Sequence, residues 1–163
     1  MKSYPTSTFL PPTRNLPGLD SSELFGLPLL VPADFSMEYT SGPVRSIVGP
    51  RSFVRLQPLT ERAWIIEIGE RAHVHSNNND ETIHRVAKIS HSDVLDIYQE
   101  VILQDFFNLR GTYVNPAVFA GGRSSLRVVA NGDTKFVSVS NTTVQEFRDV
   151  VAVLYDIANT AAH

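Results

Sequence analysis

Three histidines in the middle of the chain are the side chains that most resemble a site for chemistry. His73 and His75 lie two residues apart, so on a strand they would project from the same face. His-x-His is a common beginning of a metal site, and His84, Asp80 or Glu81 would supply a third ligand. No Cys-x-x-Cys or His-Glu-x-x-His signature accompanies them. A metal-binding or small-ligand module is therefore one hypothesis, and a plain polar strand face is the simpler interpretation.

Other groups of reactive residue types favour structural roles. His91-Ser92-Asp93 contains the residue types of a hydrolase triad, but neighbouring residues at a helix start cannot adopt the triad geometry. Residues 77–81 are rich in oxygen ligands yet lack the order of a calcium loop, so they are interpreted as a turn. The chain has no cysteine, which excludes disulfides and thiolate sites. We therefore expect no catalytic residue and no cofactor.

Composition predicts one globular domain. The 163 residues are 42% hydrophobic and 19% charged, with a net charge of −3. The densest basic stretch, Arg45, Arg51, Arg55 and Arg62, is spread out, which argues against nucleic-acid binding and leaves room for an acidic partner. No apolar run approaches the ~20 residues of a transmembrane helix, and no secretory signal follows Lys2. We expect a soluble, cytoplasmic protein without a transmembrane segment.

The beginning of the chain differs from the rest. Six of the ten prolines lie in the first 34 residues, where no helical or strand period is visible. Disordered tails have low hydrophobicity, whereas leucines and phenylalanines are interspersed here, so docking is favoured over disorder. Residues 1–33 are predicted to form an extended arm that contacts a partner through apolar side chains, namely Phe9, Leu10, Leu16, Leu19, Leu24, Phe25, Leu27, Leu29 and Leu30.

Residues 34–163 are predicted to form a single α+β domain. Alternating apolar and polar residues indicate strands over residues 35–40, 52–57, 63–68 and 82–89. Pro50 and Pro58 bracket the second of these strands. Gly69-Glu70 is typical of a two-residue hairpin turn, which would lead into a strand over residues 72–75.

Helices and a further hairpin complete this domain. Ser90, followed three residues later by Asp93, predicts the start of a helix that ends near Phe107. Asn131-Gly132 predicts a hairpin between residues 125–130 and 134–140. Asn141 or Thr142 would cap a final helix, whose apolar positions repeat at spacings of three and four: Val144, Phe147, Val151, Leu154, Ala158 and Ala161. The expected fold is a mostly antiparallel sheet of five to seven strands, packed by two amphipathic helices.

Some of these residues also support a resemblance. The pattern F-x-x-x-Y-x-x-G starts at Phe35, and the first helix runs into F-F-x-L at Phe106, followed by Tyr113. With the hairpin and the closing helix, this layout resembles a type of bacterial α+β domain often found in small exported proteins, over about three quarters of the chain. The resemblance implies a fold and no known activity, and it implies no functional residues. The chain departs from the exported pattern in lacking a signal peptide and a lipoprotein cysteine.

The sequence thus favours a non-catalytic interaction or structural subunit. It would dock on a larger protein assembly through residues 1–33, and whether that assembly is membrane-associated stays open. The alternative is a small-ligand or metal-binding module that uses His73, His75 and His84.

Overall fold

The computed structural model describes residues 29–43, 51–71, 81–118 and 121–161. The predicted strand over residues 72–75 therefore lies outside the described residues, as does the arm up to residue 28. The elements follow in chain order: β1 (Ser36–Pro43), β2 (Arg51–Thr60), β3 (Ala63–Arg71), β4 (Glu81–Ile89), α3 (His91–Leu103), the 3-10 helix η1 (Phe106–Asn108), β5 (Thr112–Val114), β6 (Gly122–Ala130), β7 (Asp133–Ser140) and α4 (Gln145–Ala161).

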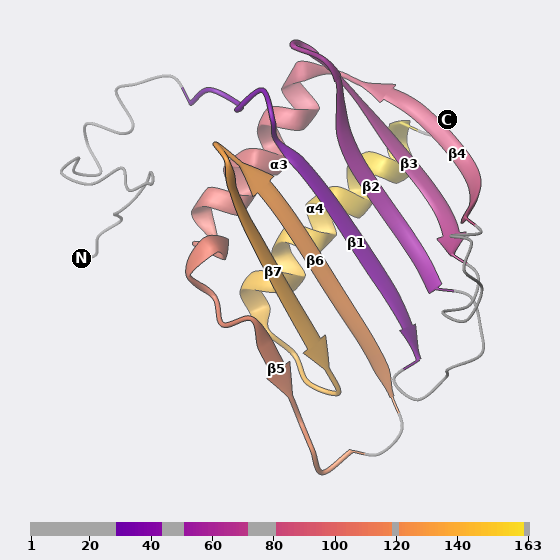
Figure 1. Ribbon diagram of the computed structural model, residues 1–163, viewed down its shortest axis with the longest axis vertical. Helices are drawn as coiled ribbons and strands as arrows, with labels where there is room; N and C mark the ends of the chain where they lie inside the picture. Colours follow the sequence, from indigo (N-terminus) through magenta and orange to yellow (C-terminus); the bar gives the residue numbers. More distant parts are fainter. Residues whose placement is uncertain (1–28, 44–50, 72–80, 119–120, 162–163) are drawn as a thin grey trace, which may run out of the picture. The chain divides into compact units, whose positions relative to one another are not determined.

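The strands form one seven-stranded sheet in the order β4-β3-β2-β1-β6-β7-β5. All neighbours are antiparallel except β5 and β7, which are parallel. Helices α3 and α4 both lie behind the sheet as it is viewed in Figure 1, so they cover the same face. We call the other side of the sheet the open face. The predicted α+β class, with five to seven strands and two helices, is confirmed.

The core lies between the sheet and the two helices. Alternate residues of the strands point toward the helices and are buried: Met37, Tyr39, Val54, Leu56, Trp64, Ile66, Leu126, Val128 and Val137. They meet the buried sides of α3 and α4: Val94, Ile97, Val101, Phe147, Val150, Leu154 and Ala158. The Trp64 Nε1–H group donates to the Phe35 carbonyl at 3.0 Å, so this buried indole keeps a hydrogen-bond partner.

Helices α3 and α4 are both present, but some of their first and last residues differ from the prediction. The Ser90 hydroxyl accepts the Asp93 backbone N–H at 3.0 Å, which confirms the predicted cap of α3. This helix ends at Leu103, earlier than predicted, because Asp105 takes a left-handed conformation (φ 50°). Helix α4 starts at Gln145, so the predicted cap at Asn141 or Thr142 is wrong; the Asn141 amide donates instead to the Val118 carbonyl. Within the described ranges, neither helix combines the length and apolarity of a membrane span.

The Asn131-Gly132 hairpin is confirmed, and a distant residue supports it. Asn131 and Gly132 have φ angles of 55° and 81°, the paired positive values that a type I′ turn needs. The Asp34 carboxylate accepts both backbone N–H groups of the turn, at 2.8 and 2.7 Å. These bonds hold the β6–β7 turn against the entry to β1.

The predicted hairpin turn at Gly69-Glu70 is wrong. Strand β3 continues through both residues to Arg71 and pairs with β4. Gly69 lies directly opposite Phe53 of β2, and a Cβ at Gly69 would collide with the Thr82 carbonyl and lie 2.8 Å from Phe53 Cζ. Glycine is needed here for close packing rather than for a turn. Pro58 likewise does not end β2; it lies within the strand, beside a register irregularity.

Both edges of the sheet are unsuited to pairing with another strand. At one edge, the register with β3 shifts in β4 so that His84 has no opposite residue, and Arg85 and Lys88 are exposed. At the other edge, β5 has only three residues. Bulges, charged side chains and short length are devices that prevent edge-to-edge association.

Candidate functional site

Of the three predicted metal ligands, the structure describes only His84. Its Nε2 atom lies 3.3 Å from Glu70 Oε2, and both side chains are about half exposed. No group of three potential metal ligands occurs among the described residues. His73 and His75 lie outside the described residues, so the metal hypothesis stays a prediction.

The predicted contact residues of the arm fall mostly outside the described ranges. Phe9, Leu10, Leu16, Leu19, Leu24, Phe25 and Leu27 are not described. Leu29 is partly exposed and Leu30 is 75% exposed. Their role in partner binding therefore stays a prediction.

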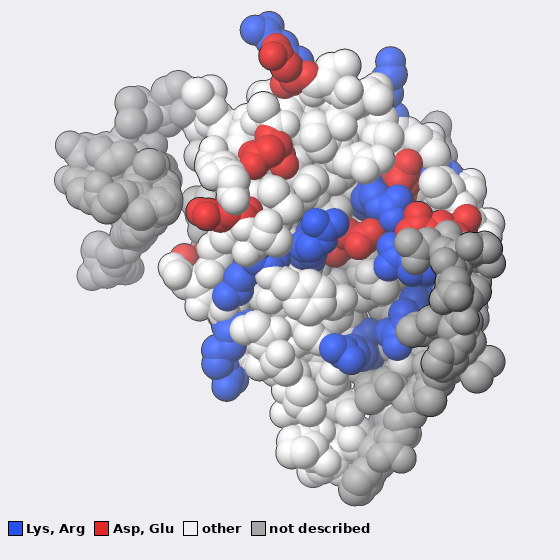
Figure 2. All heavy atoms as spheres, viewed as in Figure 1, with Lys and Arg blue, Asp and Glu red and all other residues white. Residues whose placement is uncertain are grey.

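On the open face, one line of side chains crosses six strands in register. Its inner members alternate in charge, because Arg127 lies opposite Glu38, Glu38 opposite Arg55, and Arg55 opposite Glu67. An apolar residue stands opposite each end of this charged run. We call the line the central row: Phe136, Arg127, Glu38, Arg55, Glu67 and Val86. Figure 2 shows basic and acidic side chains gathered across this face.

Two arginines bind three carboxylates around the central row. Arg55 donates to Glu38 at 3.0 Å, to Glu67 at 3.0 Å and to Glu81 at 2.7 Å. Arg71 donates to Glu38 at 3.0 Å and to Glu81 at 2.7 Å. These five residues are named the charged cluster. The planar guanidinium suits such forked binding, and each carboxylate has at least one cationic donor.

The charged cluster lies on an aromatic ring. Phe53 is fully buried although its position in β2 points to the open face. The guanidinium carbon of Arg55 lies 4.7 Å from the centre of the ring, and that of Arg71 lies 5.4 Å from it. Both distances are within the range of a cation–π interaction. Gly69 leaves room for this ring, so Phe53 forms a base for the charges.

The cluster shifts the pKa values of Glu81, Arg55 and Arg71 in the directions that keep these groups charged. Hydrogen bonding from Arg55 lowers the pKa of Glu81, against the opposing effect of burial and with further help from Arg71. Burial by itself lowers the pKa of Arg55, but hydrogen bonds with Glu81 and Glu38 outweigh burial, and the pKa is raised. The pKa of Arg71 is raised in the same way. These three groups are therefore charged at neutral pH.

Glu81 should make the free energy of unfolding depend on pH in the acidic range. Because its folded pKa lies below the unfolded value, its contribution is complete above the ordinary glutamate pKa and is lost as pH falls through the folded pKa. We expect Glu81→Gln to be about 1–2 kcal/mol less stable at pH 7, with a smaller loss at pH 3. Urea denaturation across this pH range measures both. Glu61→Gln, at an exposed turn position, is the control; an equal loss at both pH values for Glu81→Gln would contradict the prediction.

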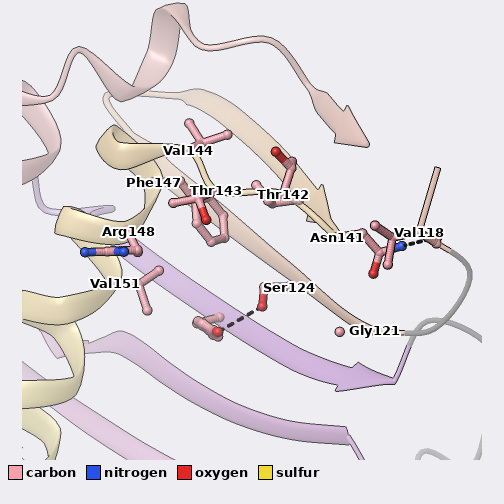
Figure 3. A pocket seen from close by; sticks show the side chains of 13 residues that line it. Val118, Gly121, Ser124, Asn141, Thr142, Thr143, Val144, Phe147, Arg148 and Val151 are labelled. Atoms are coloured by element: carbon pink, nitrogen blue, oxygen red, sulfur yellow. Dashed lines mark hydrogen bonds between the residues drawn. The ribbon is translucent and has the colours of Figure 1, made fainter. Parts of the chain in front are cut away.

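A second feature is a hollow of about 500 Å³ on the helix side, beside the start of α4 (Figure 3). Tyr39 and Ser124 share a hydrogen bond of 3.0 Å in its wall. Asn141 donates from Nδ2 to the Val118 carbonyl at 3.0 Å, and its Oδ1 has no partner among the described residues. The rest of the lining combines threonine, valine and glycine residues with Phe147 and Arg148. The hollow is open to solvent and gathers no set of groups for acid–base or metal chemistry.

Sequence reasoning missed the charged cluster, although a local signal for it exists. In each of three strands, one charged residue stands between two residues that face the helices: Glu38 in β1, Arg55 in β2 and Glu67 in β3. A lone charge in the middle of an apolar strand indicates a partner on the neighbouring strand. The identity of that partner needs the strand order, which the signal does not contain.

No protein-family model matches this chain, and no curated protein matches its sequence. What the open face can do follows from its own side chains. It presents exposed apolar groups and arginine at the ends of a fixed line of charges. Within the charged cluster, each carboxylate is paired with at least one arginine.

Proposed function

We propose that the chain is a non-catalytic interaction or structural subunit of a larger protein assembly. The observation that carries the proposal is the open face, which lies opposite both helices and carries exposed apolar side chains beside charges. Phe136 is 49% exposed and Val86 is 57% exposed, while Arg127 is also exposed. Aromatic residues and arginine are enriched at protein interfaces, so this composition fits a docking surface.

The charged cluster supports a binding role rather than a chemical one. Each of its three glutamates is paired with an arginine, and the Phe53 ring contacts the guanidinium groups of both arginines. Side chains held in this way lose little conformational freedom when a partner binds, which lowers the entropic cost of association.

Residues 1–33 are proposed to bind a neighbouring chain of the same assembly. Their composition carries this part of the proposal: prolines limit the conformations that must be lost on ordering, and apolar side chains between them can bury surface. An extended segment of this length covers a large surface with few residues.

Deletion of residues 1–33 should leave the domain folded but weaken its binding to the assembly. The core described above is built from residues after position 34, so the truncated protein should keep the melting temperature of the full chain within a few degrees. Its recovery with the native complex should fall at least about tenfold, because the arm's apolar contacts are gone. Affinity purification from the source, with the full chain as control, measures the recovery. Equal recovery of both forms would count against an arm-mediated contact.

A further inference from the structure

We infer that the open face binds a second copy of this chain. This inference rests on the proposed function and names the partner of one surface. The two sheets would pack face to face around a two-fold axis that runs parallel to the strands, between β1 and β2. A two-fold interface places residue i of one copy on residue j of the other and, by symmetry, j on i.

The central row is complementary to itself under this operation. Read from β7 to β4 it is apolar, positive, negative, positive, negative, apolar. Rotation about the axis reverses the order in the second copy. Arg127 then faces Glu67 of the second copy, Glu38 faces Arg55, and Phe136 faces Val86. Every charge of the central row meets the opposite charge, and each apolar end of the row meets the other apolar end.

The neighbouring row toward the hairpin adds a further apolar contact. Val129 of β6 pairs with Ser36, and Ile65 of β3 pairs with Gln57, one row from the central row. Under the same rotation, Val129 faces Ile65 of the second copy. On the far side of the central row, Arg123 comes opposite Arg71, a like-charge contact that opposes association; Glu38 and Glu81 bind Arg71 within its own copy.

The charge pattern also selects the direction of the axis. A two-fold axis perpendicular to the strands would place Arg127 on Arg127 and Glu38 on Glu38 of the second copy. Like charges at an interface cost several kcal/mol, so that arrangement is disfavoured. Edge-to-edge pairing is disfavoured by the bulge and the charges of β4 and by the shortness of β5.

The size of the surface suits a stable dimer. Six strands span about 24 Å, and an eight-residue strand is about 27 Å long. The overlapping area is therefore about 650 Å² per copy, of the same order as the ~800 Å² per partner of ordinary specific interfaces.

Sedimentation velocity over a concentration series tests the inference with a charge reversal. Arg127→Glu would place glutamate against Glu67 twice in each dimer, so the dimer Kd should rise at least about 100-fold. Arg148→Glu is the matched control, because this arginine is also exposed but belongs to α4 on the opposite side of the sheet. The control should sediment like the wild type, and circular dichroism should show that both variants are folded.

Cysteine cross-linking tests the axis independently of Arg127. The chain has no native cysteine, so Phe136→Cys and Val86→Cys each introduce a unique thiol. A short bismaleimide should join the two variants when they are mixed, because the two positions face each other. Phe136→Cys alone should not cross-link to itself, since its two copies would lie about 24 Å apart across the interface.

A wild-type dimer that Arg127→Glu dissociates, together with the mixed cross-link, would support the inference. A monomeric wild type, a dimer that Arg127→Glu leaves unchanged, or a cross-link between two Phe136→Cys chains would overturn it. Should Arg127→Glu fail to fold, the cross-linking result decides. A monomer that still enters the native complex through residues 1–33 would overturn only the second-copy inference and leave the proposed function standing.

Discussion

Arg55→Met is expected to lower the free energy of unfolding by about 3 kcal/mol. The substitution leaves an aliphatic side chain of similar length but removes the donor shared by Glu38, Glu67 and Glu81. Removing one partner of a buried ion pair typically costs about 3–5 kcal/mol, because a charge remains without compensation. Here that charge is Glu67, which Arg55 alone binds among the described residues, whereas Glu38 and Glu81 keep Arg71. The Arg55 side chain is 20% exposed, so the lower end of this range applies.

Urea denaturation at pH 7 measures this loss of stability. Two further variants serve as a control and as a partial rescue. Arg148→Met removes an exposed arginine of α4, outside the open face, and should change stability by no more than about 0.5 kcal/mol. Arg55→Lys should recover only part of the loss, because a single ammonium cannot reach three carboxylates as the forked guanidinium does. If Arg55→Met and Arg148→Met proved equally mild, the charged cluster would not stabilise the fold.

The largest expected loss belongs to Phe53→Ala, at about 3–5 kcal/mol. A fully buried aromatic ring leaves a cavity when it is truncated, and the sheet relaxes only partly around it. The loss is increased because Gly69 opposite has no side chain to fill the space. The two arginines above the ring would also lose their cation–π contacts.

Leu103→Ala is the control for truncation of a large apolar side chain. Leu103 is 72% exposed at the end of α3, outside the open face, and its truncation should cost less than about 1 kcal/mol. Thermal unfolding monitored by circular dichroism compares the two variants. A Phe53→Ala protein as stable as Leu103→Ala would show that the ring contributes no more than a surface contact.

The parts of the fold that sequence predicted are those fixed by local chemistry. The Ser90 cap of α3 and the Asn131-Gly132 turn each depend on a few neighbouring residues, and both are confirmed. The alternation in β1 was equally legible, because a strand with one buried face must repeat every two residues. Helix ends were less accurate, since the left-handed conformation of Asp105 is not a property of its neighbours alone.

The features that sequence could not predict depend on partners far along the chain. Gly69 has the pattern of a turn residue, yet its role is set by Phe53 and by the Thr82 carbonyl on the strands beside it. The charged cluster joins Glu38 to Arg71, 33 positions apart, through a strand order that no local pattern contains. For the same reason the complementarity of the central row became visible only once the register of six strands was known.

The two blunt edges of the sheet have a consequence for how assembly stops. A strand that adds to a free edge exposes a new edge, so growth of that kind has no natural end and produces fibrils. Strand addition is disfavoured at both edges of this sheet. At one edge β4 has a bulge and charged side chains, and at the other β5 has only three residues. The two-fold contact inferred above occupies the open face of both copies, so association through that surface stops at two chains.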